Sequence, residues 1–382
     1  MRIVQILPSM ETGEVALTAL EFAQELVKQG HESIVVSAGG ELVSRLNLHG
    51  SQHLRLAVEK SSLRTFVLVG RLRALLQELA PDIVHARGPL PARLSFSAIR
   101  KIPAGYRPHL VTSIHEKPRR GLLRGRLSNA ALCRGERVIA ASSALATCLQ
   151  QTYPSAFAQL PPEVIHRGVN TRELDGSAPV SGHWHQRILN DFPQLEGKHW
   201  LLLPAVVAPG QGQQQFLEML AAIRLQRDDV FGLVLGDIPD GGDKYARKLE
   251  NLAEQMGLHE HVLFLGRRRD MREFYASARI TYDLAEVANG TGRVVAESLA
   301  MSCPAVTLAG SGAGAEIAGH CFPQGVIAEN TTDALVNASL EILDSPRPIC
   351  FDGFTLQDST RRTLALYESL TRGQGQEAAS MG

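Results

Sequence analysis

The sequence predicts an α/β protein that contains two doubly wound lobes, each built on a parallel sheet. Three observations predict this fold class. The chain has 382 residues, which is more than one compact core usually accommodates. Short β-branched segments alternate with longer helical patterns along the chain. The strands are apolar without an alternation of apolar and polar residues, as in LVTSI (110–114) and RVIAA (137–141), which a parallel sheet covered on both faces requires.

The first lobe is expected to cover residues 1–170. Its strands are predicted at residues 3–7, 33–37, 82–85, 109–114, 137–141 and 163–166. Helical patterns lie between them, with a first helix that ends at Gly30 and others at 41–48, 62–79, 90–99 and 144–151. This strand–helix–strand order predicts a doubly wound sheet with helices on both faces.

A boundary follows, because the periodicity fades between residues 167 and 198 into a stretch of Gly, Pro, Ser, His and Asn. We expect a linker over 171–198 and a second lobe of the same class over 199–350. Its strands are predicted at 200–207, 230–235, 261–265, 279–284 and 304–308. Its helices are predicted at 213–225, 244–256, 270–276, from about Gly292 onward, and at 332–343.

The C-terminal part of the chain contains one more helical pattern, at 355–370. We expect residues 351–371 to form a helix that packs back on the first lobe. Residues 372–382 lack apolar periodicity and are expected to be disordered.

The composition excludes several function classes. Lys plus Arg equals Asp plus Glu, at 39 each, so the overall charge favours no nucleic-acid partner. The five cysteines are widely spread and form no metal or redox pair, and no Asp-x-Asp sequence occurs. We therefore expect no metal and no cofactor. The N-terminus does not resemble a signal peptide, and no apolar stretch is long enough to span a bilayer. These features predict a cytoplasmic protein, with peripheral attachment to the inner face of the cytoplasmic membrane as the alternative.

Two glycine-containing turns are candidate phosphate sites. In the second lobe Asn289, Gly290, Gly292 and Arg293 lie where a helix is predicted to begin, near Gly292, so free amide groups and the positive helix end converge on one point. A diphosphate fits such a point, and Glu297 could bind a ribose hydroxyl or cap the edge of the core. In the first lobe the loop 8–14 contains Gly13 but no G-x-G-x-x-G pattern, which gives nicotinamide or flavin binding little support. An ordinary strand-to-helix turn is the alternative there.

Seven segments, in order along both lobes, resemble the retaining glycosyltransferases of family 4, which include lipopolysaccharide-core hexosyl- and heptosyltransferases. The segments are 20–40, 79–88, 109–116, 136–143, 164–170, 262–278 and 292–306. The resemblance implies the GT-B fold, in which two Rossmann-like domains face each other across a cleft. It also implies a nucleotide sugar as the donor substrate and a glycan or glycolipid as the acceptor.

The sequence departs from three signatures that the resemblance implies for the donor site. One of two adjacent glycines in the first-lobe loop is replaced, which leaves Gly13. The Arg and Lys that clamp the diphosphate are replaced by Val206 and Gln211, just before Gly212. The first of two glutamates, which binds the donor sugar, is replaced by Asn289, whereas Glu297 retains the second. Loss of such charged contacts commonly costs about a hundredfold to a thousandfold in rate.

Other residues could supply what is missing. Arg267, Arg268 and Arg269 follow a predicted strand and are possible compensating cations, with a solvated turn as the alternative. His115, at the end of the strand 109–114, takes the place where the resemblance implies a catalytic histidine over the donor sugar, to orient it or to transfer a proton. A strand-end histidine satisfied by the backbone is the other interpretation.

The segment 117–135 has the strongest charge asymmetry, with basic residues interleaved with leucines and no acid. It could bind an anionic membrane surface or the phosphates of a lipid-linked acceptor, or it could be a solvated loop. Its basic residues are Lys117, Arg119, Arg120, Arg124, Arg126 and Arg134.

Two functions remain in competition. The first is an active glycosyltransferase that moves a hexose or heptose from a nucleotide sugar to a lipopolysaccharide-type or other cell-surface glycan. The second is a catalytically impaired relative that serves as a binding or scaffold partner of an active transferase, as the replaced clamp residues would allow. A sugar-phosphate epimerase has less support, because residues 262–278 and 292–306 follow the transferase pattern.

Overall fold

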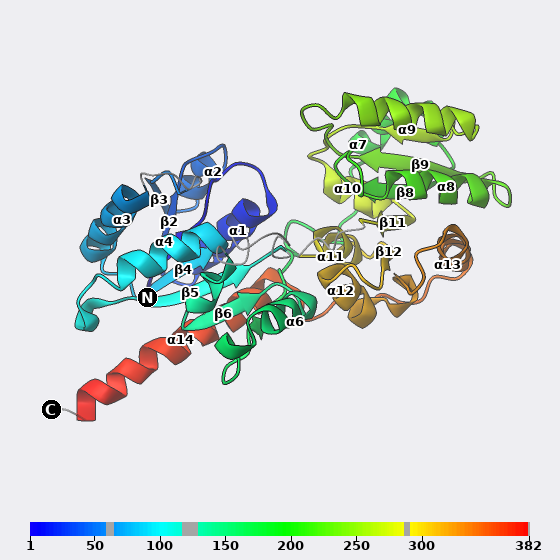
Figure 1. Ribbon diagram of the computed structural model, residues 1–382. Coiled ribbons are helices and arrows are strands. Elements are labelled where there is room, and N and C mark those ends of the chain that lie inside the picture. The colour runs from blue at the N-terminus through cyan, green and yellow to red at the C-terminus, as the bar shows by residue number, and fades with distance from the viewer. Residues whose placement is uncertain (59–64, 117–128, 286–290, 381–382) are drawn as a thin grey trace. The chain divides into compact units, whose positions relative to one another are not determined.

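The computed structural model describes residues 1–58, 65–116, 129–285 and 291–380 (Figure 1). The chain divides into two compact units. Unit 1 contains Met1–Gly168 and Leu356–Gly382, and unit 2 contains Val169–Thr355. Each unit is built on one fully parallel sheet with helices packed against it. The predicted fold class of two doubly wound Rossmann-like domains is confirmed, whereas the cleft between them stays a prediction.

The sheet of unit 1 has the strand order β3-β2-β1-β4-β5-β6-β7. Its strands are β1 (Arg2–Ile6), β2 (Glu32–Ser37), β3 (Gln52–Arg55), β4 (Ile83–Arg87), β5 (His109–Ile114), β6 (Arg137–Ala140) and β7 (Glu163–Val164). Its helices are α1 (Glu14–Lys28), α2 (Val43–Leu48), α3 (Thr65–Leu79), α4 (Pro89–Ile99), α6 (Ser143–Thr152) and α14 (Leu356–Ser380). Every residue of β4 is buried, as a central strand covered on both faces requires.

The order in which strands are added to this sheet reverses between β1 and β4. These two strands are parallel neighbours and pair from Ile3 with Ile83 onward. From β1 the chain proceeds to β2 and β3 on one side, and from β4 to β5, β6 and β7 on the other. Loops at such a point leave in opposite directions and open a crevice at the carboxyl ends of the strands. This edge is therefore where a ligand of unit 1 is expected.

Unit 2 has the same kind of sheet, with the strand order β10-β9-β8-β11-β12-β13. The order in which its strands are added reverses between β8 and β11. Its strands are β8 (His199–Pro204), β9 (Val230–Leu235), β10 (Val262–Phe264), β11 (Ile280–Asp283), β12 (Ala305–Leu308) and β13 (Val326–Ile327). Its helices are α7 (Gly182–Asp191), α8 (Gln213–Arg224), α9 (Asp243–Gln255), α10 (Met271–Ser277), α11 (Arg293–Ala300), α12 (Ala313–Cys321) and α13 (Thr332–Asp344).

The linker predicted over residues 171–198 is wrong, because this segment belongs to unit 2 and contains α7. Trp184 on α7 is buried, its Nε1 donates to Oδ2 of Asp270 at 2.7 Å, and its ring meets Phe274 edge-on with 5.2 Å between centroids. Few apolar residues mark the segment, but two of them, Trp184 and Ile188, lie four positions apart on one helix face and are buried together. Unit 2 thus begins at Val169 and not at residue 199.

The C-terminal helix α14 packs on unit 1. Leu364, Tyr367 and Leu370 join a core cluster with Ile3 and Phe22, and Figure 1 shows the helix in red beside the sheet of this unit. The helix reaches Ser380 and so includes most of the stretch 372–382 that the sequence predicts to be disordered. Gln, Glu and Ala in this stretch have good intrinsic helix propensity, even without an apolar stripe.

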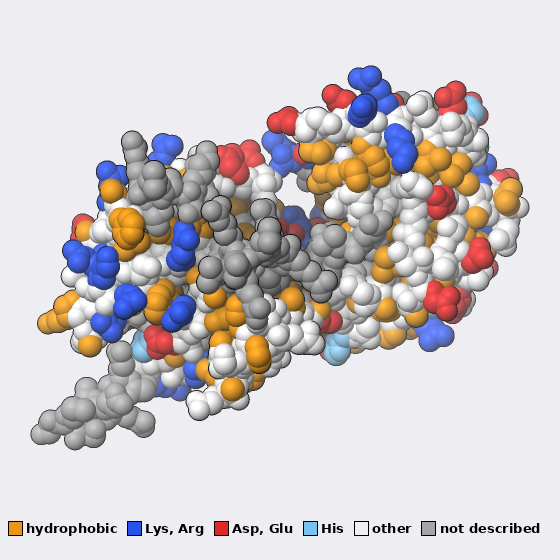
Figure 2. All heavy atoms as spheres, in the orientation of Figure 1, with side chains coloured by type: hydrophobic (Ala, Val, Ile, Leu, Met, Phe, Trp, Pro, Cys, Tyr) orange, Lys and Arg blue, Asp and Glu red, His pale blue; other side chains and the backbone are white. Residues whose placement is uncertain are grey.

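On the face drawn in Figure 2, Lys and Arg side chains lie among acidic, polar and hydrophobic ones on both units. Among the helices of the described ranges, none is long and apolar enough to cross a membrane.

Candidate functional site

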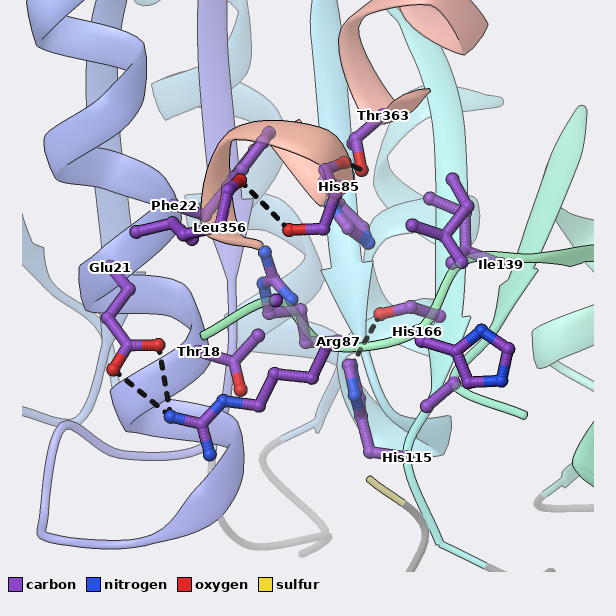
Figure 3. A pocket seen from close by; sticks show the side chains of 16 residues that line it. Thr18, Glu21, Phe22, His85, Arg87, His115, Ile139, His166, Leu356 and Thr363 are labelled. Carbon is purple, nitrogen blue, oxygen red and sulfur yellow. Dashed lines mark hydrogen bonds and ion pairs between the residues drawn. The ribbon is translucent and has the colours of Figure 1, made fainter. Parts of the chain in front are cut away.

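A small cavity lies at the carboxyl ends of the strands of unit 1, and we call it the unit 1 cavity (Figure 3). Its volume is about 50 Å³. Arg87 at the end of β4, His115 just after β5 and Glu21 on α1 converge on it, and Leu356 and Ser359 from the first turn of α14 line its other side. The titratable residues that line it are Glu21, His85, Arg87, His115, His166 and Arg167. It therefore lies at the position that the strand order of unit 1 indicates.

Arg87 is the most unusual residue of this cavity, because it is charged and only 4% exposed. Its Nε donates to Oε1 of Gln5 on β1 at 2.8 Å, and its guanidinium lies over the Phe22 ring, 5.6 Å from the centroid. Burial lowers the pKa of Arg87 to about 10, so it stays charged at neutral pH. Arg87 was not among the site residues predicted from the sequence, although a cation at the end of a central strand could have identified it.

His85 lies two residues before Arg87 on β4 and therefore on the same face of the sheet. Its Nδ1 is 2.7 Å from the hydroxyl of Tyr367 on α14, and its Nε2 is buried with no hydrogen-bond partner among the described residues. Burial, with Arg87 and His115 nearby, holds the pKa of His85 well below its usual value. When the neutral ring of His85 accepts from Tyr367 at Nδ1, its proton lies on Nε2. This N–H group then has no acceptor among the described residues.

His115, the predicted catalytic histidine, lines the same cavity. Its Nε2 lies 2.9 Å from the hydroxyl of Ser113. Burial lowers the pKa of His115 to about 3, with Arg87 and Arg167 as further causes. The ring is therefore neutral at physiological pH, which suits an orienting hydrogen bond better than donation of a proton as a general acid.

Arg167 lines the cavity with its charge already paired. Its terminal nitrogens donate to Oε1 of Glu14 at 2.7 Å and to Oε2 of Glu21 at 3.0 Å, and both acids lie on α1. This arrangement fixes the segment after β7 against α1. Arg167 was also missed, because the sequence does not show which helix the segment 164–170 contacts.

The predicted first-lobe loop forms a second hollow in unit 1. Gly13 precedes α1 in an extended backbone conformation that any residue can adopt, and a Cβ there meets nothing closer than 3.9 Å. Gly40 is the crowded glycine, with φ +146° and no room for a Cβ beside the backbone of Met10 and Glu11. A hollow of about 520 Å³ lies beside it, lined by Ser9, Glu11, Gly39, His53 and Arg55 among others.

In unit 2 a glycine in the left-handed region precedes α8. Gly212 has φ +84°, and a Cβ there would collide with Leu284 just after β11. The start of α8 is therefore held against the end of β11. This is the point at which the strand order of the sheet reverses, between β8 and β11. Of the two replaced clamp residues in this loop, Gln211 is half-buried and Val206 is 49% exposed.

A second such glycine precedes α11. Gly292 has φ +61°, and its Cβ position lies only 2.6 Å from the backbone nitrogen of Gly314. Glu297, four residues after the start of α11, accepts from Nε of Arg293 at 2.6 Å and from the Tyr275 hydroxyl at 3.2 Å. Asn289 and Gly290 lie outside the described residues, as do Lys117, Arg119, Arg120, Arg124 and Arg126 of the basic segment.

The three consecutive arginines after β10 differ in what they contact. Arg268 donates to both carboxylate oxygens of Asp270, at 2.9 and 2.7 Å, and lies over the Phe274 ring. Arg267 is exposed, with Nε 3.8 Å from Oδ2 of Asp237. Arg269 is exposed and has no partner among the described residues. Arg269 and Arg267 are therefore the cations that remain open to a ligand.

No group of three or more His, Cys, Asp or Glu in the described part of the chain is arranged to hold a metal ion. The groups that could hold a diphosphate in unit 2 are the backbone amides at the starts of α8 and α11, together with exposed arginine side chains.

Comparisons with known families match both units. Residues 15–173 match the family described as Glycosyltransferase Family 4, and residues 187–350 match the family described as Glycosyl transferases group 1. No curated protein matches the sequence.

Solved structures share the fold over nearly the whole chain at low sequence identity. A glycosyltransferase from Rickettsia africae ESF-5 is 20% identical with a TM-score of 0.81, and the match covers 96% of this chain and 98% of that one. HepE from Anabaena, in complex with UDP-glucose, is 18% identical with a TM-score of 0.74 and full coverage of both chains. WaaG, a glycosyltransferase involved in lipopolysaccharide biosynthesis, is 17% identical with a TM-score of 0.64, covering 97% and 98%.

Proposed function

Because the chain belongs to the GT-B glycosyltransferases, whose two halves its two units match, we propose that it transfers a hexosyl or heptosyl group from a nucleotide sugar. The acceptor is a lipopolysaccharide-type or other cell-surface glycan, and the anomeric configuration is retained. The reaction needs no metal and no further cofactor. The protein works in the cytoplasm, where the basic segment 117–135 attaches it to the inner face of the membrane.

One observation carries the donor part of this proposal. The helices α8 and α11 follow the two central strands of unit 2, and each begins at a left-handed glycine that no larger residue can replace without a clash. Such helix starts direct free amide groups and a positive dipole end at one point, which suits a diphosphate. The complex of HepE with UDP-glucose supports the same class of donor.

Unit 1 supplies the acceptor side in this proposal. Neutral His115 forms one hydrogen bond to the donor sugar and orients it. The role of WaaG in lipopolysaccharide biosynthesis supports a glycan of this type as the acceptor.

A transfer assay tests this function. The purified protein is incubated with UDP-, GDP- and ADP-sugars and truncated lipopolysaccharide, and the released nucleotide and the product are measured. We expect release with one donor only, and proton NMR of the product should show the donor's own anomeric configuration. An inverted product contradicts retention. Release with none of the donors favours the scaffold function instead.

The replaced clamp offers a second test. Val206 is half-exposed and Gln211 half-buried in the loop after β8, so a cation at either position stays in partial contact with solvent. The variant Val206→Arg/Gln211→Lys should bind UDP at least about tenfold more tightly than the unmodified protein, since charge-assisted hydrogen bonds to phosphate are strong. Unchanged affinity would show that the diphosphate does not lie at the start of α8.

A further inference from the structure

The unit 1 cavity contains a buried cation that has no counter-ion among the described residues. Only Nε of Arg87 is hydrogen-bonded among the described residues, and its acceptor, Gln5, is neutral. Phe22, the other group in contact with the guanidinium, is neutral too. A buried charge with no partner of opposite sign is strongly unfavourable in a protein interior. Arg87 therefore has unused donor capacity and charge at the wall of a cavity.

The remaining charges around the cavity do not neutralise Arg87. Among the described residues that line the cavity, Glu21 is the one carboxylate, and it already accepts from Arg167, as does Glu14. Tyr367, which lies near Arg87, keeps its proton, because burial raises its pKa far above the usual value. The charge of Arg87 is left for a group that enters from outside.

Two further features of the cavity favour an anion. Nε2 of His85 is a buried ring nitrogen with no partner among the described residues. The first turn of α14 contributes Leu356 and Ser359 to the opposite wall, and the amides at a helix start favour negative charge. The open donors of the wall formed by β4 are therefore the side chains of Arg87 and His85, which come from the same face of this strand.

The size of the cavity limits what can enter. About 50 Å³ holds roughly four water molecules, which is enough for one phosphate group but not for a hexose ring. A ligand that inserts a phosphate here keeps its sugar outside the cavity.

We propose that the unit 1 cavity is a subsite for a phosphate monoester carried by the acceptor glycan, with Arg87 as its anchor and His85 as a second donor. This assignment to the acceptor rests on the proposed function, in which the diphosphate of the donor is bound by unit 2. The subsite selects phosphorylated acceptors, because an acceptor without the phosphate leaves Arg87 unpaired.

Binding to the full chain tests the proposal. Thermal unfolding and calorimetry are recorded with inorganic phosphate, glucose 6-phosphate, glucuronate and UDP, for the unmodified protein, Arg87→Gln and the control Arg71→Gln. Arg71 is an exposed arginine on α3 of the same unit. We expect phosphate and glucose 6-phosphate to bind the unmodified protein and Arg71→Gln, and to bind Arg87→Gln at least about tenfold more weakly. Affinity for UDP should be unchanged.

Several outcomes would overturn the proposal. The first is that phosphate does not stabilise the protein at concentrations up to about 10 mM. The second is that phosphate and glucose 6-phosphate bind Arg87→Gln as tightly as the unmodified protein. The others are that glucuronate binds more tightly than glucose 6-phosphate, or that inorganic phosphate binds and glucose 6-phosphate does not. If Arg87→Gln does not fold, a crystal of the unmodified protein soaked in selenate decides, and an anomalous peak beside Arg87 is expected. Phosphate binding without any nucleotide binding would refute the donor proposal and leave the anion subsite standing.

Discussion

Arg293 and Glu297 form an ion pair along one face of α11, with Nε of the arginine 2.6 Å from Oε1 of the glutamate. The other carboxylate oxygen accepts from the buried hydroxyl of Tyr275 at 3.2 Å. The family resemblance implies that Glu297 binds a ribose hydroxyl. In unit 2 its carboxylate already has two partners, Arg293 and Tyr275. A ribose at this point would share the carboxylate with Arg293 and Tyr275, which fix its orientation.

The contact between Tyr275 and Glu297 should be visible in stability. Glu297→Ala leaves the Tyr275 hydroxyl buried without an acceptor, and the expected loss is about 1–3 kcal/mol of unfolding free energy. Much of this loss should be absent when Tyr275→Phe is present as well, because no hydroxyl then needs a partner. Urea unfolding of both single variants and the double variant measures the coupling. Strictly additive effects would show that the two side chains do not interact.

Gly292 should not tolerate a side chain. Gly292→Ala places a Cβ 2.6 Å from the backbone of Gly314 at φ +61°, and the combined strain and collision should cost at least about 2 kcal/mol. Gly310→Ala in the same unit is the matched control, because nothing lies within 4 Å of its Cβ position. It should change stability by less than about 0.5 kcal/mol. Equal melting temperatures for the two variants would contradict the close approach of α11 and α12.

The histidines of the unit 1 cavity should make stability depend on pH. In the unfolded chain His85 and His115 take up protons near the ordinary pKa of 6.5, whereas in the folded protein both pKa values lie far lower, at about 3 for His115. The unfolded state therefore binds more protons as the pH falls, and stability is lost below about pH 6.5. Each histidine contributes a slope of up to about 1.4 kcal/mol per pH unit.

His115→Gln should remove one of these two slopes. The measurement is the urea midpoint between pH 7.5 and 5, a range in which exposed carboxylates stay ionised. Parallel pH profiles for His115→Gln and the unmodified protein would mean that this ring takes up its proton at the same pH in the folded protein as in the unfolded chain.

The three arginines after β10 should separate into structural and binding roles. Arg268→Gln breaks two hydrogen bonds to Asp270, which also holds Trp184, so it should lower the melting temperature. Arg269→Gln should leave the melting temperature within about one degree, because surface changes rarely exceed about 0.5 kcal/mol, yet it should weaken binding of a nucleotide sugar several-fold. Full retention of affinity by Arg269→Gln and Arg267→Gln together would remove these residues as substitutes for the missing clamp.

Most of the architecture could be predicted from the sequence, because apolar strands such as Leu201–Leu203 in β8 mark a sheet covered on both faces. The predictions failed where the apolar signal is sparse. The edge strand β3 contains Gln52, His53 and Arg55, and its pairing with β2 is set by the neighbouring strand and not by its own pattern. Helix α7 depends on Trp184 and Ile188, whose partners lie far along the chain.

The candidate site was harder to predict for the same reason. Gly212 and Gly292 were identified because glycines before a helix are visible in the sequence. The surroundings of Arg87 were not, because Gln5, Phe22 and Tyr367 come from three different elements and meet only in the folded unit. His115 was selected for its position at a strand end, but its neutral state follows from burial and from two arginines that the sequence places far apart.

Binding of a nucleotide sugar tests the account most directly. The melting temperature of the full chain is recorded against increasing concentrations of UDP-glucose, UDP-galactose, GDP-mannose and ADP-heptose. We expect one of them to raise it progressively, by mass action on the folded state, and Gly292→Ala to abolish the rise. A melting temperature that stays constant with all four donors at millimolar concentration would contradict the assignment of a nucleotide-sugar site to unit 2.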